Sequence, residues 1–274
     1  MLIDFHTHSF PEKIAARTID ILESNTERVE GKRSRACTDG TVKGLLKSMS
    51  EYGVDISVVM PIATNPKQAD TINRVAQETN AIDGLYSFGS LHPIQEDWER
   101  VIEDIYARGL KGVKLHPEYQ QFYIDSPESI RVLKKCEELG LLVTLHTGRD
   151  IGIEPPVHCM PERLRRVLDY ELSGKNIIAA HMGGWRAWDE VERYLVGTPI
   201  LLDTAYVSRD MDKDRFERIV KQHGSDKVLF ATDSPWECPS ETVEYIESLN
   251  LTAAEKADIY YRNASKLLGI EERD

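Results

Sequence analysis

Short apolar runs alternate along the whole chain with longer stretches in which apolar residues recur at helical spacing. Several of the short runs are continuous β-branched or aliphatic segments, which is typical of strands buried on both faces. The pattern predicts eight strands, at Leu2–Phe5, Ile56–Met60, Leu85–Ser90, Gly112–Leu115, Leu142–Leu145, Ile177–Ala180, Ile200–Leu202 and Val228–Ala231.

Helical segments between these strands carry start and stop signals. A serine, threonine or aspartate before the first turn, a proline inside it and a glycine just past the end are the usual boundaries of a helix. Three helices are the clearest. The first begins at Ser126 and closes at Gly140, the second covers Asp97–Arg108 and closes at Gly109, and the third covers Met160–Leu172 and ends near Gly174.

Eight strands in alternation with helices, with no change of composition between the halves, predict a single domain over residues 1–274. The expected fold is a (β/α)8 TIM barrel, for which 274 residues is a common length. A doubly wound open sheet is the alternative, because periodicity alone does not separate the two. No G-x-G-x-x-G follows the first strand, which disfavours the nucleotide-binding form of that alternative.

The least regular stretch is Ser24–Gly40, which is polar and charged. It falls where the loop after the first strand of a barrel would lie, and long loops in compact domains are often functional. We expect either a lid over the site or a plain long loop.

Candidate chemistry gathers at the predicted strand ends. His6 and His8 follow the first strand, and residues two apart on a strand point to the same side, so both imidazoles can face one ion. Further polar residues end the fourth, fifth, sixth and eighth strands: Lys114, His116, His146, His181 and Asp233. The carboxyl ends of barrel strands form one rim, where active sites lie. Neutral imidazoles with one carboxylate suit a first-row divalent ion such as Zn²⁺ and leave a position for water.

Composition narrows the partners. The net charge is −12, from 34 basic and 46 acidic residues, which argues against a nucleic acid or an anionic membrane surface and favours a small-molecule substrate. The four cysteines form no C-x-x-C pair, and no signal sequence or membrane span is evident, so a cytoplasmic protein with reduced thiols is expected. The sequence leaves open whether the chain forms a homo-oligomer.

Taken together, these motifs identify a family. The sequence resembles the amidohydrolase superfamily, in its branch of aminocarboxymuconate-semialdehyde decarboxylase-like metal-dependent hydrolases. The resemblance covers nearly the whole chain and rests on Ile3–Lys13, Lys114–Pro117, Leu145–Gly148, Ala180–Gly184, Leu229–Trp236 and Asn263–Leu268.

The resemblance implies roles for the rim residues. It makes His6, His8, His146 and Asp233 the ligands of one divalent ion, zinc by preference with manganese or iron as alternatives. His181 would orient or deprotonate the activated water, and Asp233 would carry a proton to the leaving group.

Three further residues are expected at the substrate. His116 would contact it, and Arg149 would bind an anionic group unless it pairs with Asp150 or Glu154. Lys114 would bind a substrate carboxylate. In binuclear relatives a carboxylated lysine near this position bridges two metals, and only then would a second metal be held, with His181 among its ligands.

The expected activity is hydrolysis of a small amide, ester or lactone by a metal-activated water. Non-oxidative decarboxylation of a small carboxylic acid is the alternative, because it uses the same ligands. A metal-dependent nuclease or phosphoesterase is disfavoured, since those barrels carry a glutamate ligand on the fourth strand, where this chain has Lys114 and His116.

Overall fold

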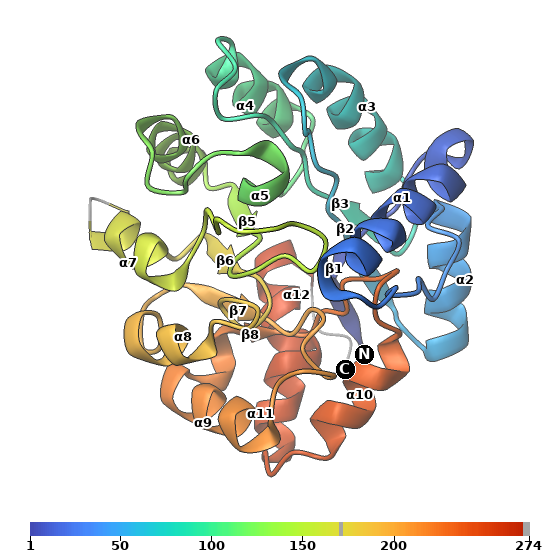
Figure 1. The fold of residues 1–274 in the computed structure, drawn as a ribbon, viewed down its shortest axis with the longest axis vertical. Coiled ribbons are helices and arrows are strands. Elements are labelled where there is room, and N and C mark those ends of the chain that lie inside the picture. Colours follow the sequence, from blue (N-terminus) through green and yellow to red (C-terminus); the bar gives the residue numbers. More distant parts are fainter. Residues whose placement is uncertain (170–171, 271–274) are drawn as a thin grey trace.

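Eight parallel strands in chain order form the centre of the structure (Figure 1). The computed structural model describes residues 1–169 and 172–270. The strands are β1 Ile3–Thr7, β2 Ile56–Val59, β3 Leu85–Ser87, β4 Gly112–Leu115, β5 Leu142–Leu145, β6 Ile177–Ala179, β7 Leu201–Asp203 and β8 Val228–Leu229. All eight predicted strands are confirmed, with boundaries that differ by up to three residues; β1 continues past Phe5, so His6 lies within it.

Two hydrogen-bonded seams close these strands into a barrel. β1–β2–β3 and β4–β5–β6–β7–β8 each pair in parallel, with one shift of register between Asp4 and Thr7 in the pairing of β1 with β2. Between β3 and β4, the Gly89 N–H donates to Gly112 O over 2.8 Å, and the Lys114 N–H donates to Gly89 O over 2.9 Å. Between β1 and β8, the Phe5 N–H donates to Phe230 O over 2.9 Å. The TIM barrel is therefore confirmed, and the open-sheet alternative is wrong.

Most helices surround the strands as an outer ring, while α1 crosses in front of β1 and α12 lies near the centre of the view (Figure 1). The helices are α1 Glu12–Glu30, α2 Val42–Tyr52, α3 Ala69–Asn80, α4 Trp98–Ala107, α5 Pro117–Gln120, α6 Pro127–Glu138, α7 Pro161–Asp169, α8 Trp188–Tyr194, α9 Lys213–His223, α10 Pro239–Glu247, α11 Ala253–Ala257 and α12 Asn263–Leu268, with short turns η1 Pro66–Gln68, η2 Ser225–Lys227 and η3 Asp258–Arg262. None of the helices in the described ranges is both long and apolar enough to cross a bilayer.

The predicted helix boundaries follow from capping. The Ser126 side chain accepts a hydrogen bond from the Ser129 N–H at the start of α6, as a cap residue before a first-turn proline should. α4 lies inside the predicted Asp97–Arg108. α7 begins at Pro161 as expected and is described to Asp169; the predicted end, Leu172, is not helical, and residues 170–171 lie outside the described ranges.

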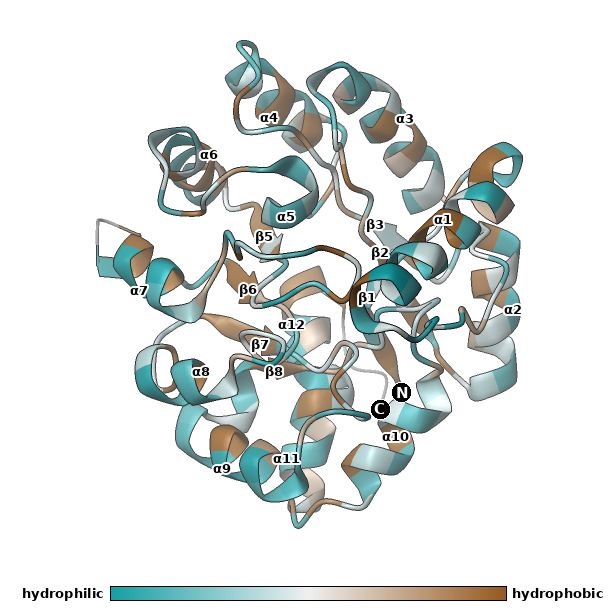
Figure 2. Cartoon of the chain, viewed as in Figure 1, coloured by the Kyte–Doolittle hydropathy of each residue, from teal (hydrophilic) through white to brown (hydrophobic). Residues whose placement is uncertain are grey.

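Apolar side chains fill the barrel from within and join it to the helices. Figure 2 shows the strands and the inward sides of the outer helices as hydrophobic, with hydrophilic residues outermost. Inside the barrel, Phe5 and Phe88 pack edge to face with ring centroids 6.0 Å apart, and Val58 and Met60 point the same way. This packed interior gives the strand ends a rigid base.

The expectation that Ser24–Gly40 is irregular is wrong for its first part, because α1 continues to Glu30. Its inward positions are polar: Glu23 is buried and bound by Arg33 at 2.9 Å and Arg35 at 3.0 Å. Thr26 is buried as well and accepts from the Ser34 N–H. Within residues 24–30 only Val29 is apolar, so this part of the helix has no apolar pattern in the sequence.

Candidate metal centre

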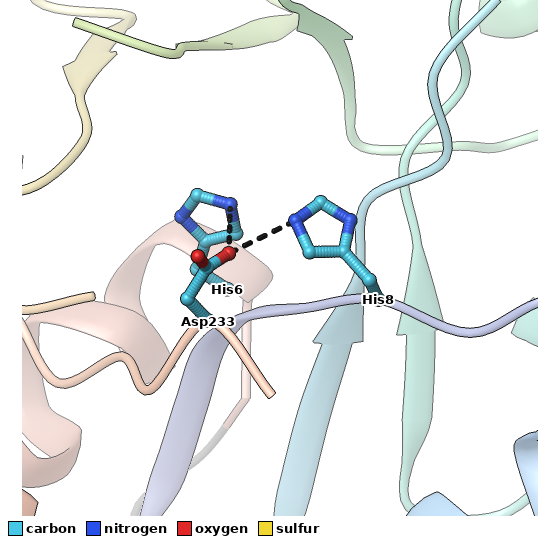
Figure 3. Close-up of side chains that lie close together, drawn as sticks. All are labelled: His6, His8 and Asp233. Carbon is cyan, nitrogen blue, oxygen red and sulfur yellow. Dashed lines mark ion pairs between the residues drawn. The ribbon is translucent and has the colours of Figure 1, made fainter. Parts of the chain in front are cut away.

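Three of the predicted ligands meet at the seam where the first and last strands join (Figure 3). His6 is the fourth residue of β1, His8 follows the end of that strand, and Asp233 follows β8. Asp233 Oδ1 lies 3.0 Å from His8 Nε2 and 3.4 Å from His6 Nε2. The close spacing of these donor atoms makes the three residues one candidate metal-binding group.

Two more histidines stand next to this group on the same rim. His181 Nε2, beyond β6, lies 3.0 Å from His146 Nδ1, beyond β5. The His181 ring is 5.7 Å from the His6 ring, centroid to centroid, so the two sets face one space. Lys114 Nζ, on β4, is buried 2.9 Å from His6 Nε2. The rim predicted from the sequence is thus assembled, with His146 closer to His181 than to the three-residue group.

Each of these four imidazoles is held from behind by an oxygen acceptor. The pairs are His6 Nδ1 with Asp203 Oδ2 at 2.9 Å, His8 Nδ1 with Met60 O at 2.8 Å, His181 Nδ1 with Ala205 O at 2.8 Å, and His146 Nε2 with Arg149 O at 3.1 Å. Neither a backbone carbonyl nor an ionised carboxylate has a hydrogen to donate. The ring nitrogen that faces such an oxygen therefore carries the proton. In a neutral imidazole the other nitrogen then bears a lone pair.

Four lone pairs therefore point into one small space. His181 Nε2 and His146 Nδ1 face each other at 3.0 Å, and as neutral rings they have no proton to share. His8 Nε2 faces a carboxylate oxygen in the same way. A cation between such acceptors satisfies them together, and outer hydrogen bonds of this type commonly orient metal-binding histidines. The residues present fit a divalent metal with nitrogen and carboxylate ligands.

Burial keeps two of these rings neutral. Desolvation, followed by the charge of Lys114, lowers the pKa of His6 well below its ordinary value. Desolvation likewise lowers the pKa of His146, with His116 and His181 adding to the effect. Burial opposes ionisation of Asp233, but a proton on the adjacent His8 and positive charge on His6 and His181 outweigh burial and lower its pKa to about 2, so a positive charge beside Asp233 favours its carboxylate form. Neutral imidazoles and an ionised carboxylate are the protonation states that bind a metal.

A second acidic and histidine cluster, His116, His146 and Asp150, does not fit a metal. His116 Nδ1 accepts from the Tyr119 N–H at 3.3 Å, so its Nε2 carries the proton and donates towards Asp150 Oδ2 at 3.3 Å. The His146 nitrogen nearest Asp150 is the one that donates to Arg149 O. Both rings present N–H groups to this carboxylate, which leaves no imidazole lone pair for an ion. Stacking 4.1 Å from His146, His116 steadies that ring instead.

Several residues at this rim have strained backbones. His181, Tyr206 and Asp233 adopt positive φ angles of 60°, 54° and 62°. Residues other than glycine rarely take this conformation, and such strain concentrates at functional sites. The positive φ angles turn the chain sharply after β6 and β8. The two predicted catalytic residues, His181 and Asp233, lie at these turns.

A cavity of about 560 Å³ opens onto the candidate metal centre. Aromatic side chains form part of its wall: Tyr119, Trp185, Tyr206 and Trp236. Lys114 and Arg149 bring positive charge to it. Within the described residues no ion pair joins Arg149 to Asp150 or Glu154, so the structure supports neither pairing.

Sequence reasoning missed the role of Asp150 and of the backbone acceptors. Asp150 was considered only as a partner of Arg149, whereas it lies beside His116. The carbonyls of Met60 and Ala205 belong to strand ends, and no residue type marks a carbonyl that will receive an imidazole. Asp203, at the end of β7, contacts His6 Nδ1 and accepts a hydrogen bond from the His181 N–H, so it links two of the site histidines.

Comparison with known proteins agrees with this geometry. A family model described as Amidohydrolase matches residues 3–270. No curated protein matches the sequence. Among solved structures, 5-carboxyvanillate decarboxylase from Sphingomonas paucimobilis is 19% identical, with a TM-score of 0.71 over 98% of this chain and 99% of that one.

Two further structures show the same fold. A 5-carboxyvanillate decarboxylase from Novosphingobium aromaticivorans, with bound manganese, is 15% identical, with a TM-score of 0.71 over 98% of this chain and 97% of that one. A probable 2-pyrone-4,6-dicarboxylic acid hydrolase from Acinetobacter baumannii is 16% identical, with a TM-score of 0.66 over 98% and 99%. At these identities the likeness is one of fold.

Proposed function

The chain belongs to the amidohydrolase family, and from that premise we propose that it is a metal-dependent enzyme that hydrolyses a small amide, ester or lactone. The observation that carries the proposal is the set of four imidazole lone pairs aimed at one space beside Asp233. We assign His6, His8, His146 and Asp233 as ligands of one divalent ion. Zinc suits these donors, and manganese, which one structural neighbour binds, or iron are the alternatives.

A divalent ion at this place would lower the pKa of a bound water and polarise a substrate carbonyl. His181, fixed by Ala205 O, would orient that water through Nε2. Asp233 would take the proton of the water and pass the same proton to the leaving group. Lys114 Nζ is buried beside His6 and can hold a substrate carboxylate, since it presents three N–H donors away from water.

Non-oxidative decarboxylation of a small carboxylic acid is the second candidate. The positive charges of Lys114 and Arg149 at an aromatic-walled cavity favour it, because they would bind a carboxylate while the wall excludes water. Two of the neighbouring folds carry the name of a decarboxylase. The same ligands serve both reactions, so only assays distinguish them.

The test begins with metal analysis of the purified protein, in which about one divalent ion per chain is expected. A panel of lactones, esters and amides is then assayed for acid release, and a panel of aromatic and aliphatic acids for CO2 release. Acid release supports hydrolysis and CO2 release supports the second candidate. A protein that holds no divalent ion would refute both.

Two variants separate the proposed roles. His146→Ala should lose tight metal binding, because it removes a ligand. His181→Ala should keep the metal and lose turnover, because it removes the group that positions water. The reverse pattern would exchange the two roles. Binding of small molecules rather than nucleic acid stays a prediction, supported by the net charge of −12. A cytoplasmic setting stays a prediction from the cysteine pattern.

A further inference from the structure

The cavity at the metal centre continues well beyond the barrel mouth. Besides the strand-end histidines, it is lined by Thr71, Ile72, Val75, Ala76 and Thr79 of α3. Ile14, Thr18 and Leu22 of α1 line it from the opposite side. Residues at these spacings share one face of their helix. One face of each helix therefore borders the cavity.

The inner end of this extension lies between the barrel wall and the helix ring. Val59 and Ser87 line it, and both belong to the strands β2 and β3. Val58 and Met60 face the barrel interior, so the intervening Val59 faces outward, where it packs with residues of α2. We call the space bounded by β2, β3, α1 and α3 the side channel.

Small residues on α3 create the side channel. On the neighbouring α4, Val101, Ile102 and Ile105 are fully buried in the core, so that helix packs directly on the barrel. The fully buried positions of α3 are Ala69, Asn73, Ala76 and Thr79, which leave space that larger aliphatic side chains would fill.

Apolar side chains of the side channel lack the partners that such residues normally have. Ile72 and Val75 are half-buried, yet neither belongs to a hydrophobic cluster of the described residues nor packs against one. The same holds for Leu22 and Ile62. These four side chains face the cavity, where a bound apolar group would complete their packing.

We propose that the substrate carries an unbranched apolar chain, which lies in the side channel while its reactive group reaches the metal centre. The inference rests on the proposed function for the position of the reactive group. From Thr71 to Thr79 the helix rises roughly 12 Å. A polypeptide advances about 1.2 Å per backbone bond when extended, so a similar carbon chain of roughly ten atoms spans that length.

The polar groups of the channel support an uncharged occupant. The Ser87 hydroxyl is directed to Val59 O at 3.3 Å and Phe88 O at 3.2 Å, so it offers no free donor to a ligand. Lys114, Asp150 and Asp233 stand at the metal end, and Lys67 lies on the exposed outer side. The charge distribution therefore places the polar group of the substrate at the metal and its chain in the channel.

Binding of linear carboxylates to the zinc-loaded protein tests the proposal. Dissociation constants for acetate, butanoate, hexanoate, octanoate and decanoate are measured by calorimetry. Each methylene that is fully buried should tighten binding by about fourfold. The gain should continue to about ten carbons. A dissociation constant that does not change between butanoate and decanoate would refute the side channel.

Two tryptophan variants on α3 locate the effect. Val75→Trp fills the channel and should abolish the gain beyond butanoate while leaving acetate binding unchanged. Glu78→Trp is the matched control, because Glu78 is exposed and lies outside the cavity lining, so its chain-length profile should equal that of the parent protein. If Val75→Trp keeps the gain, or both variants lose it, the proposal is wrong.

The outcome is separable from that of the enzymatic assays. The carboxylate series measures binding and needs no turnover, so it stays informative when no hydrolysis or CO2 release is found. Turnover of lactones or acids without any dependence on chain length would refute the side-channel proposal and leave the proposed reaction standing. Chain-length dependence without turnover would retain the channel and refute the proposed reactions.

Discussion

Asp203 is a fully buried carboxylate that contacts two of the site histidines. Its Oδ1 accepts from the His181 N–H at 2.9 Å and the Ala205 N–H at 3.1 Å, and its Oδ2 faces His6 Nδ1 at 2.9 Å. One buried carboxylate thus sets the tautomer of a proposed ligand and anchors the strained turn that carries His181. It does not line the cavity and acts through His6 and the turn at His181, so it is a positioning residue.

Asp203→Asn should weaken metal binding by about tenfold to a hundredfold. The amide oxygen can keep the two backbone N–H groups, but its NH2 then faces His6 Nδ1 and favours the tautomer with a proton on Nε2. That proton occupies the place of the metal. Competition titration with a chelating dye measures the change.

Circular dichroism and a melting curve serve as the control, because the variant must keep the parent fold for the comparison to hold. Unchanged affinity in a folded Asp203→Asn protein would show that Asp203 does not control the His6 tautomer.

Glu118 offers a second prediction at this scale, on stability. Burial raises its pKa to about 7, while the His158 N–H donates to Oε1 at 2.7 Å. Its Oε2 has no hydrogen-bond partner among the described residues. The folded protein then binds this proton more tightly than the unfolded chain, so stability falls as pH rises from about 4.5 to about 7.

Glu118→Gln removes that loss while retaining an oxygen for the His158 N–H. We expect the variant to be more stable than the parent at pH 8, by up to about 3 kcal/mol in free energy of unfolding. At pH 4 the two should be nearly equal, because the parent glutamate is protonated there. Urea unfolding at the two pH values measures the difference, and a gain of the same size at both would contradict the assigned cause.

The candidate ligands could be predicted from the sequence, whereas their surroundings could not. His6, His8 and Asp233 were evident because each follows a strand whose apolar pattern is strong, and strand ends of a barrel share one rim. The acceptors behind the rings are mostly backbone carbonyls, such as Met60 O, and carry no residue signature. Which oxygen accepts from each imidazole depends on the geometry of the loops after the strands. That geometry cannot be predicted from a single sequence.

At the scale of elements, α1 differs most from expectation. Strands and most helices were predictable since their buried positions are apolar and their ends are capped. α1 instead covers the barrel mouth, with a cavity under part of one face and the buried Glu23 under another. Hydrophobic periodicity reports packing against a core, so a helix over a cavity escapes it.

The carboxyl end of α1 is held by ionic contacts, and these can be weakened. Glu30 lies 2.8 Å from Arg186, which also binds Asp210 at 3.0 Å. Glu30→Gln should loosen this end, so that limited proteolysis within residues 31–40 becomes a few times faster. The free energy of unfolding should change by less than about 1 kcal/mol, because the pair is partly exposed.

Glu27→Gln is the matched control, since Glu27 is more exposed and lies 3.8 Å from Arg33. Its cleavage rate should equal that of the parent. Equal rates in all three proteins would show that the contact with Arg186 does not hold α1 over the mouth.

At the scale of the whole molecule, the proposed metal lies where the chain closes on itself. β1 is the first strand and β8 the last, and they meet through the Phe5 N–H and Phe230 O. His6 and His8 come from one side of this seam and Asp233 from the other. An ion bound there would join segments more than two hundred residues apart in the sequence, in addition to its role in chemistry.

Metal binding should therefore stabilise the entire barrel. A ligand that binds only the folded chain adds about 1.4 kcal/mol for each tenfold rise in its free concentration above the dissociation constant. Thermal unfolding in zinc buffers of increasing free concentration should show a steadily rising Tm, and a chelator should return it to the metal-free value. In His146→Ala the rise should begin only at higher zinc concentrations. A Tm that changes with neither zinc nor chelator would mean that no ion bridges β1 and β8. The imidazole nitrogens that face the site would then have to be protonated instead.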